Sequence, residues 1–171
     1  INTRILRAAV ALLCLASFHA AANAADSWGR LPASQRAAAE ASGVRVVADF
    51  GSWLWVHGDA NELSNRGAEG IATTAQTFEL DLGGERFDPL ERFPDSLAGL
   101  ARDVEPSLHL IQMVGPTRTA WLDDLKSRDV ETVQYIPPFT YVVWSSGSAL
   151  AQAAAANSAV RWAGSFDASW R

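Results

Sequence analysis

The second half of the chain alternates hydrophobic and polar positions in four short runs, separated by two stretches of helical periodicity. Runs rich in β-branched and aromatic residues are typical of strands, whereas hydrophobic residues three or four positions apart are typical of helices. The predicted elements are strands over 108–114, 130–136, 139–144 and 160–164, and helices over 119–126 and 145–157. The order β-α-β-β-α-β predicts a ferredoxin-like α+β sandwich.

The first half carries part of the same pattern. The predicted elements are a short leading helix within 26–43, strands over 44–49 and 53–57, a helix over 59–66 and a strand over 75–82. Asp59 is a favourable N-cap for the helix over 59–66, and Gly67 is a favourable stop. We therefore expect a related β-β-α-β module, which would be an incomplete version of the second one.

The two halves also align by residue type. Shifting the sequence by 86 positions, from 44 to 130, places Trp53 over Phe139 and Trp55 over Tyr141. This match favours an ancient duplication. Coincidence stays open as the alternative, because any two strand-strand-helix units share such a pattern.

The residues between the halves interrupt regular structure. Residues 83–106 contain Gly83 and Gly84 in tandem and three prolines, and such a composition is typical of a linker, with room for a short helix near 97–102. The predicted organisation is a first module over 25–82, a linker over 83–106, a ferredoxin-like module over 107–166 and a tail over 167–171.

Residues 1–24 have the three parts of a secretory signal peptide. Arg4 and Arg7 supply positive charge, about 11 apolar or small residues follow, and residues 22–24 (ANA) form a small-x-small cleavage site. A membrane span needs about 20 apolar residues, so a buried N-terminal helix is the remaining alternative. We expect cleavage after Ala24, a secreted or periplasmic protein and no membrane partner afterwards.

Charge and cysteine content narrow the function classes. Of the 14 Lys and Arg residues, Arg4 and Arg7 lie in the predicted signal peptide, which leaves 12 against 19 Asp and Glu and a net charge of −7. This acidity disfavours a nucleic-acid partner. The single cysteine, Cys14, also lies in that segment, so the remaining residues have no disulfide and no cysteine metal site.

The residue pattern shows no catalytic or cofactor site. Beyond the signal peptide the histidines are His57 and His109, each within a predicted strand, and no nucleophile elbow follows either of them. Asp123 and Asp124 are expected on a solvated helix face, and no metal-binding spacing is present. Weak calcium binding at Asp88, Glu91 and Asp95 stays open. We therefore predict no catalytic residue, no metal and no cofactor.

Aromatic residues recur at every second position of the predicted strands. Trp53 and Trp55 share one sheet face, as do Phe139 and Tyr141. One layer of helices covers only one face of such a sheet. The pattern leaves open whether these aromatics face the helices or the outer side.

Several short motifs resemble the region that precedes the catalytic domain in secreted bacterial subtilisin-like serine proteases. The similar segments are LIQM at 110–113 followed by Gly115 and Pro116, Trp121 with Leu125, YIP at 135–137 followed by YVV at 141–143, VRWAG at 160–164, and upstream ADFGSWLWV and FELDLGGERFDPL. The resemblance covers about residues 44–166 as spaced motifs. It implies a prodomain with the ferredoxin-like fold.

The resemblance implies an intramolecular chaperone and temporary inhibitor of a subtilisin-like protease domain, located downstream in the same polypeptide. Such a unit lays the outer face of its sheet on the protease and runs its tail through the substrate cleft, here residues 165–171. The docking residues implied are Tyr135, Ile136, Thr140, Val142, Gly164, Ser165 and Phe166.

Because the chain starts at Ile1 and ends at Arg171 without protease motifs, we expect a fragment of a longer precursor. These residues would not be an enzyme themselves, whereas the parent polypeptide would be a serine endopeptidase. The alternative is a stand-alone secreted protease inhibitor or protein-binding module.

Overall fold

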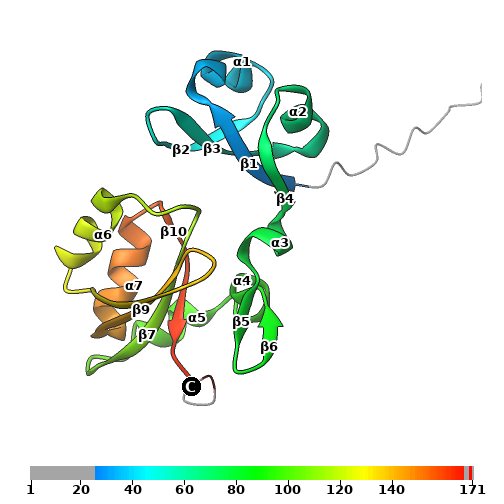
Figure 1. Cartoon of the computed structure of the whole chain (residues 1–171). Helices are drawn as coiled ribbons and strands as arrows, with labels where there is room; N and C mark the ends of the chain where they lie inside the picture. The colour runs from blue at the N-terminus through cyan, green and yellow to red at the C-terminus, as the bar shows by residue number, and fades with distance from the viewer. Residues whose placement is uncertain (1–25, 168–169, 171) are drawn as a thin grey trace, which may run out of the picture.

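The computed structural model describes residues 26–167 and residue 170, which form two α+β modules joined by a folded connecting segment (Figure 1). The predicted signal peptide, residues 1–24, lies outside the described residues. None of the helices in the described part of the chain is long and apolar enough to cross a membrane.

The second module has the predicted ferredoxin-like topology. Its elements are β7 (Pro106–Met113), α6 (Thr119–Lys126), β8 (Glu131–Ile136), β9 (Thr140–Ser146), α7 (Gly147–Ala156) and β10 (Val160–Ser165). The strands form one antiparallel sheet in the order β10-β7-β9-β8, and both helices pack on one face of it. The prediction for this half is confirmed, with bounds that differ by one or two residues.

The first module has the same topology and is complete. Its elements are β1 (Asp26–Pro32), the 3₁₀ helix η1 (Ala33–Gln35), α1 (Arg36–Ala41), β2 (Arg45–Asp49), β3 (Trp53–Asp59), α2 (Ala60–Asn65) and β4 (Glu69–Thr73). Its antiparallel sheet has the order β2-β3-β1-β4, which is the order of the second sheet read from the other edge. The two modules are therefore related in fold, as expected, but the expectation of an incomplete first module is wrong, because β1 and α1 complete it.

Two strands of the first module escape the hydrophobic pattern. A bulge opposite β4 lies between Trp28 and Arg30 of β1, so Ser27, Trp28 and Gly29 are buried in succession and the alternation is lost. The predicted leading helix is therefore confined to η1 and α1. Strand β4 (EGIAT) is short and contains Gly70, which weakens its strand signal.

The predicted strand over 75–82 divides into two elements. Residues Thr74–Phe78 form helix α3, because Thr73 and Gln76 make a capping box in which each side chain accepts a hydrogen bond from the other's backbone N–H. Residues Leu80–Leu82 form strand β5. The strand prediction is correct only for its last three residues.

The segment predicted as a linker is folded. It contains β6 (Glu85–Phe87), α4 (Pro89–Arg92) and α5 (Ser96–Leu100), and β6 pairs with β5 across the turn at Gly83 and Gly84. The indole Nε1 of Trp162 donates to the carbonyl of Phe93 (3.0 Å), and Ser96 Oγ donates to the carbonyl of Ala163 (2.6 Å). Residues 83–106 are thus an integral part of the second module.

Each module has a core between its sheet and its helices. In the second module Ile111, Met113 and Val143 of the sheet meet Leu125 and Leu150 of the helices, all fully buried. The first module has a corresponding cluster built on Leu31, Leu54, Val56 and Leu63. Phe139 and Tyr141 pack against the helix-side core of the second module, so their alternates Thr140 and Val142 point to the outer face.

The outer face of the second sheet is covered by the β5–β6 hairpin. Leu80, Leu82 and Phe87 form one buried cluster with Val142 and Trp162. A buried ion pair fixes the hairpin's exit, since the guanidinium of Arg161 donates to both carboxylate oxygens of Asp88 (2.6 Å each) and to Gln112 Oε1 (2.8 Å). This face of the sheet is therefore internal.

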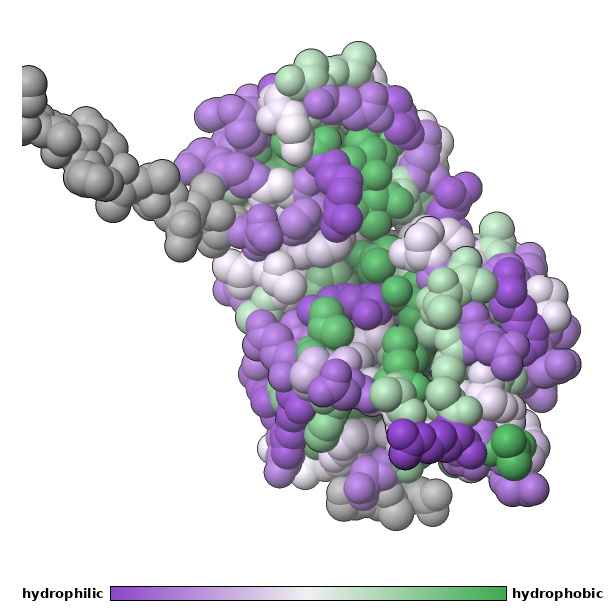
Figure 2. Space-filling view, turned by 180° about the vertical axis from the view of Figure 1, so that it is seen from behind, coloured by the Kyte–Doolittle hydropathy of each residue, from purple (hydrophilic) through white to green (hydrophobic). Residues whose placement is uncertain are grey.

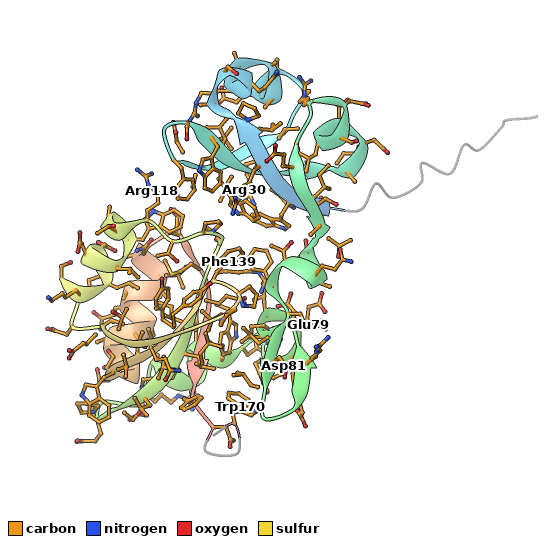
Figure 3. All side chains as sticks on the ribbon, in the orientation of Figure 1. Arg30, Glu79, Asp81, Arg118, Phe139 and Trp170 are labelled. Atoms are coloured by element: carbon orange, nitrogen blue, oxygen red, sulfur yellow. The ribbon has the colours of Figure 1, made fainter. Side chains whose placement is uncertain are left out.

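The outer face of the first sheet is covered by the second module. Trp28, Ala48 and Trp55 cluster there with Phe78 of α3 and with Phe139. The rings of Trp55 and Phe139 lie 5.8 Å apart, and Phe139 lies on the side of its module that faces the first one (Figure 3). When the molecule is seen from behind, hydrophobic residues form a band that crosses from one module to the other (Figure 2).

One hydrogen bond and one glycine define the closest approach of the modules. Trp55 Nε1 donates to the carbonyl of Val114 (2.9 Å). A Cβ added at the neighbouring Gly115 would overlap the indole of Trp55. Glycine is therefore required at position 115 for the indole to reach its acceptor.

We predict that Gly115→Ala separates the modules and lowers the free energy of unfolding by about 1–3 kcal/mol, because the added methyl group overpacks the junction. Urea denaturation followed by circular dichroism measures the change. Gly99→Ala is the control, since a Cβ at Gly99 meets no atom within 4 Å. Equal stability of both variants would contradict this account of the junction.

We also predict that Asp88→Asn lowers the free energy of unfolding by about 3–5 kcal/mol, because it leaves the guanidinium of Arg161 buried without its counter-charge. The side chains of this pair are 9% and 3% exposed. Asp81→Asn removes an ion pair with Arg86 whose side chains are mostly exposed, and should change stability by less than about 1 kcal/mol. A small effect at both positions in thermal denaturation would refute the structural role of Asp88.

Candidate functional site

The residues predicted to dock a protease do not form one open surface. Thr140 is fully buried and Val142 is 6% exposed, and Val142 lies in the cluster formed with the β5–β6 hairpin. Gly164 is also buried, with the indole of Trp162 lying against it. The prediction that Thr140 and Val142 line an open face is therefore wrong, because the β5–β6 hairpin covers that face, with β5 from the end of the predicted first module and β6 from the predicted linker.

The other predicted docking residues lie nearer the surface. Tyr135 is 47% exposed, and Ile136 next to it is half-buried against the outer-face cluster. Ser165 is exposed at the end of β10, and Phe166 is half-buried close to Trp170 (ring centroids 6.4 Å apart). The structure thus separates these four residues into two groups. Tyr135 and Ile136 lie in β8, and Ser165 and Phe166 lie at the opposite edge of the sheet.

Strand β8 is the most exposed strand of the two large sheets. It lies at the edge of its sheet, and its first five residues, 131–135, are all exposed. Edge strands carry unpaired backbone N–H and C=O groups that can pair with another chain, and proteins often protect them with Lys or Pro. Residues 131–136 contain neither residue type, and the edge is modified only by the charge of Glu131 and by a bulge between Thr132 and Gln134.

Large exposed side chains gather at this edge. Val133 is 59% exposed, and Tyr135 and Trp144 are each 47% exposed. Trp144 lies on the outer face of the neighbouring strand β9, opposite Glu131 of β8, whereas Tyr135 lies on the helix side, where its ring contacts Tyr141 edge-on with centroids 5.2 Å apart. Because the Tyr135 hydroxyl also accepts a hydrogen bond from the backbone N–H of Phe139 (3.1 Å), its ring is held in place.

The hydrogen bonds of His109 exclude it as a base for the adjacent serine. His109 Nε2 lies 3.1 Å from the carbonyl of Ser145 and 3.0 Å from Ser107 Oγ. A carbonyl only accepts, so Nε2 must carry the hydrogen and cannot take a proton from Ser107. Nδ1 is buried without a partner, and burial lowers the pKa of His109.

His57 has a structural environment as well. Its ring packs against the indole of Trp28 (4.5 Å between centroids), and Nε2 lies 3.7 Å from a carboxylate oxygen of Asp26. Burial lowers the pKa of His57, an effect that Asp26 partly opposes. Both histidines therefore favour the neutral form in the folded protein.

The acidic residues considered for metal binding have other partners or lie apart. Asp88 is bound to Arg161, so it is not available to a calcium site with Glu91 and Asp95. Asp124 accepts from Arg128 (3.2 Å) and from the side-chain amide of Asn157 (2.9 Å), whereas Asp123 is exposed. Within the described ranges, no group of three or more potential metal ligands is found.

Comparison with known protein families matches residues 81–167 to the family described as Domain of unknown function (DUF8729). The chain belongs to this family. The match begins in β5 and ends just after β10, so the DUF8729 region contains the β5–β6 hairpin, α4 and α5 together with the second module. No curated protein and no solved structure shows significant similarity to the chain.

The exposed edge could have been found in part from sequence. Alternation around 130–136 predicts a strand, and Val133 and Tyr135 are conspicuous apolar residues within it. The pattern does not show that β8 is an edge strand, because strand order depends on pairings between distant segments. Trp144 was missed as a surface residue because tryptophan in a strand normally predicts core.

We predict that the protein loses stability as the pH falls below about 6.5, the ordinary pKa of histidine. The pKa values of His57 and His109 are lowered on folding, so the unfolded chain takes up these protons first. Thermal denaturation between pH 8 and pH 5 measures the slope.

His109→Gln should flatten this slope, since glutamine can still donate to the carbonyl of Ser145 but does not titrate. His57→Gln provides the matched comparison for the less buried ring. An unchanged slope in both variants would show that other groups cause the pH dependence.

Proposed function

We propose that this DUF8729 protein is a non-catalytic protein-binding unit that binds an extended segment of its partner along strand β8. The exposure of the whole edge from 131 to 135 supports this proposal most directly. An added strand would satisfy the free backbone groups of β8, and specificity would come from the side chains beside it. Tyr135 on the helix side and Trp144 on the outer face would provide apolar contacts on the two sides of the added strand, and Val133 lies at the bulge between Thr132 and Gln134.

The covered sheet faces support an edge mode of binding. A two-layer α/β sandwich usually offers its open sheet face to a partner, but here the hairpin covers one such face and the second module covers the other. Trp170, which follows β10, is also engaged, because its ring packs against Phe87 and Phe93 with centroids 5.6 and 6.0 Å apart. A partner therefore has better access to the β8 edge.

The partner that we propose to test first is a bacterial subtilisin-like serine protease domain. The motif resemblance and the ferredoxin-like order of the second sheet support this choice. The chain would then assist folding of the protease and inhibit it temporarily, outside the cytoplasm. A secreted inhibitor or adaptor with another partner is the alternative, and it would use the same edge.

Two substitutions test the proposal: one adds a charge on β8, and the other removes an aromatic ring beside it. Val133→Lys and Trp144→Ala should each weaken binding to the protease domain about 10-fold or more, as expected for exposed contacts that become buried in a complex. Leu90→Lys is the matched control, because Leu90 is an exposed apolar residue of α4 at 38% exposure. The affinity of the Leu90→Lys variant for the protease domain should change by less than about 3-fold.

The assays are inhibition of peptide hydrolysis and recovery of activity when the denatured protease domain refolds with the chain. Absence of both effects would reject the protease as partner. Inhibition that survives Val133→Lys and Trp144→Ala unchanged would reject the β8 edge as the surface used.

A further inference from the structure

A pocket of about 480 Å³ opens between helix α5, the loop before it and the end of β10. Its aromatic walls are Phe93, Trp162 and Trp170, and Gly99 of α5 also lines it. Trp170 lies at the end of the described chain, beside the β5–β6 hairpin (Figure 3). The pocket is at the β10 edge of the sheet, opposite to β8.

The walls of this pocket are apolar because their polar atoms are already engaged. The indole Nε1 of Trp162 donates to the carbonyl of Phe93, and Ser96 Oγ donates to the carbonyl of Ala163. Gly164 allows the Trp162 ring to lie flat against the strand, since an added Cβ would overlap that ring. Because Trp162 is only 3% exposed, the half-buried rings of Phe93 and Trp170 offer most of the aromatic surface to a ligand, with few hydrogen-bonding groups.

The charged groups at the pocket are carboxylates. Asp95 and Asp167 line it, and the described lining residues include no Lys, Arg or His; Asp167 is already engaged in another interaction, and the guanidinium of Arg92 lies 5.4 Å from the centroid of the Phe93 ring. The carboxylate of Asp95 makes no cap hydrogen bond to α5. The pocket thus combines aromatic faces with negative charge.

We propose that this pocket binds a small organic cation, an ammonium group carried on an apolar or aromatic body. Aromatic faces attract cations through the ring quadrupole, and the carboxylate of Asp95 adds a Coulomb attraction that an anion would experience as repulsion. The volume lies within the usual range for small-molecule sites, about 300–1,000 Å³. This site is independent of the protein-binding function proposed for β8.

Three probes of similar shape test the charge preference: phenethylammonium, the neutral 2-phenylethanol and the anionic phenylacetate. Isothermal titration calorimetry and amide chemical shifts of the full chain measure binding. We expect phenethylammonium to bind tightest and phenylacetate to bind at least about 10-fold more weakly. Equal affinity for the cation and the anion, or no binding of the cation at millimolar concentration, would overturn the proposal.

Gly99 offers a variant that fills the pocket. A Cβ at this position enters open space, so Gly99→Leu should leave the fold intact and weaken phenethylammonium binding about 10-fold or more. Ala98→Leu on the same helix is the matched control, since Ala98 is exposed and does not line the pocket. Equal binding by both variants would place the ligand elsewhere.

Asp95→Asn separates the charge from the shape of the pocket. It should weaken the binding of phenethylammonium about 3- to 10-fold and leave 2-phenylethanol unaffected. An equal loss for both probes would indicate that Asp95 acts through the structure of the loop, and would overturn the charge-based part of the proposal. Because no protease enters these assays, their outcome does not depend on the function of β8.

Discussion

The outer face of each four-stranded sheet has to be covered, because helices pack on the other side only and the outer side also carries large apolar residues. In the first module this face presents Trp28 and Trp55, and in the second it presents Val142 and Trp162. Other parts of the same chain cover both faces. The second module closes the first face and the β5–β6 hairpin closes the second, so the relative arrangement of all parts follows from this need.

Specific polar contacts fix the way in which these faces are covered. Hydrophobic burial alone is not directional, whereas the hydrogen bond from Trp55 to Val114 sets the position of one module on the other. The ion pair of Arg161 with Asp88 does the same for the hairpin, and Gln112 extends it by donating to the carbonyl of Phe78 (2.8 Å). The connecting segment is consequently part of the domain, in agreement with the extent of the DUF8729 match.

The same coverage limits where partners can bind. A prodomain that lays its sheet face on a protease needs that face open, and Thr140 and Val142 are enclosed in this chain. The two surfaces that we propose for binding are the edge strand β8 and the aromatic pocket at the opposite edge. These two surfaces differ in chemistry: β8 offers backbone groups and exposed apolar side chains, whereas the pocket offers ring faces and carboxylates.

The sequence by itself determined the elements of the second module, because alternation in the strands and the face formed by Trp121 and Leu125 are local properties of the chain. It also determined that Phe139 and Thr140 point to opposite faces. The bulge in β1 removed the alternation that would have revealed that strand, and α3 and α4 are too short for a periodic signal, whereas the short helix expected near 97–102 corresponds to α5. Only the tertiary structure decided which face is covered, which strand is an edge and which aromatic rings line a pocket, because these depend on contacts between residues far apart in sequence.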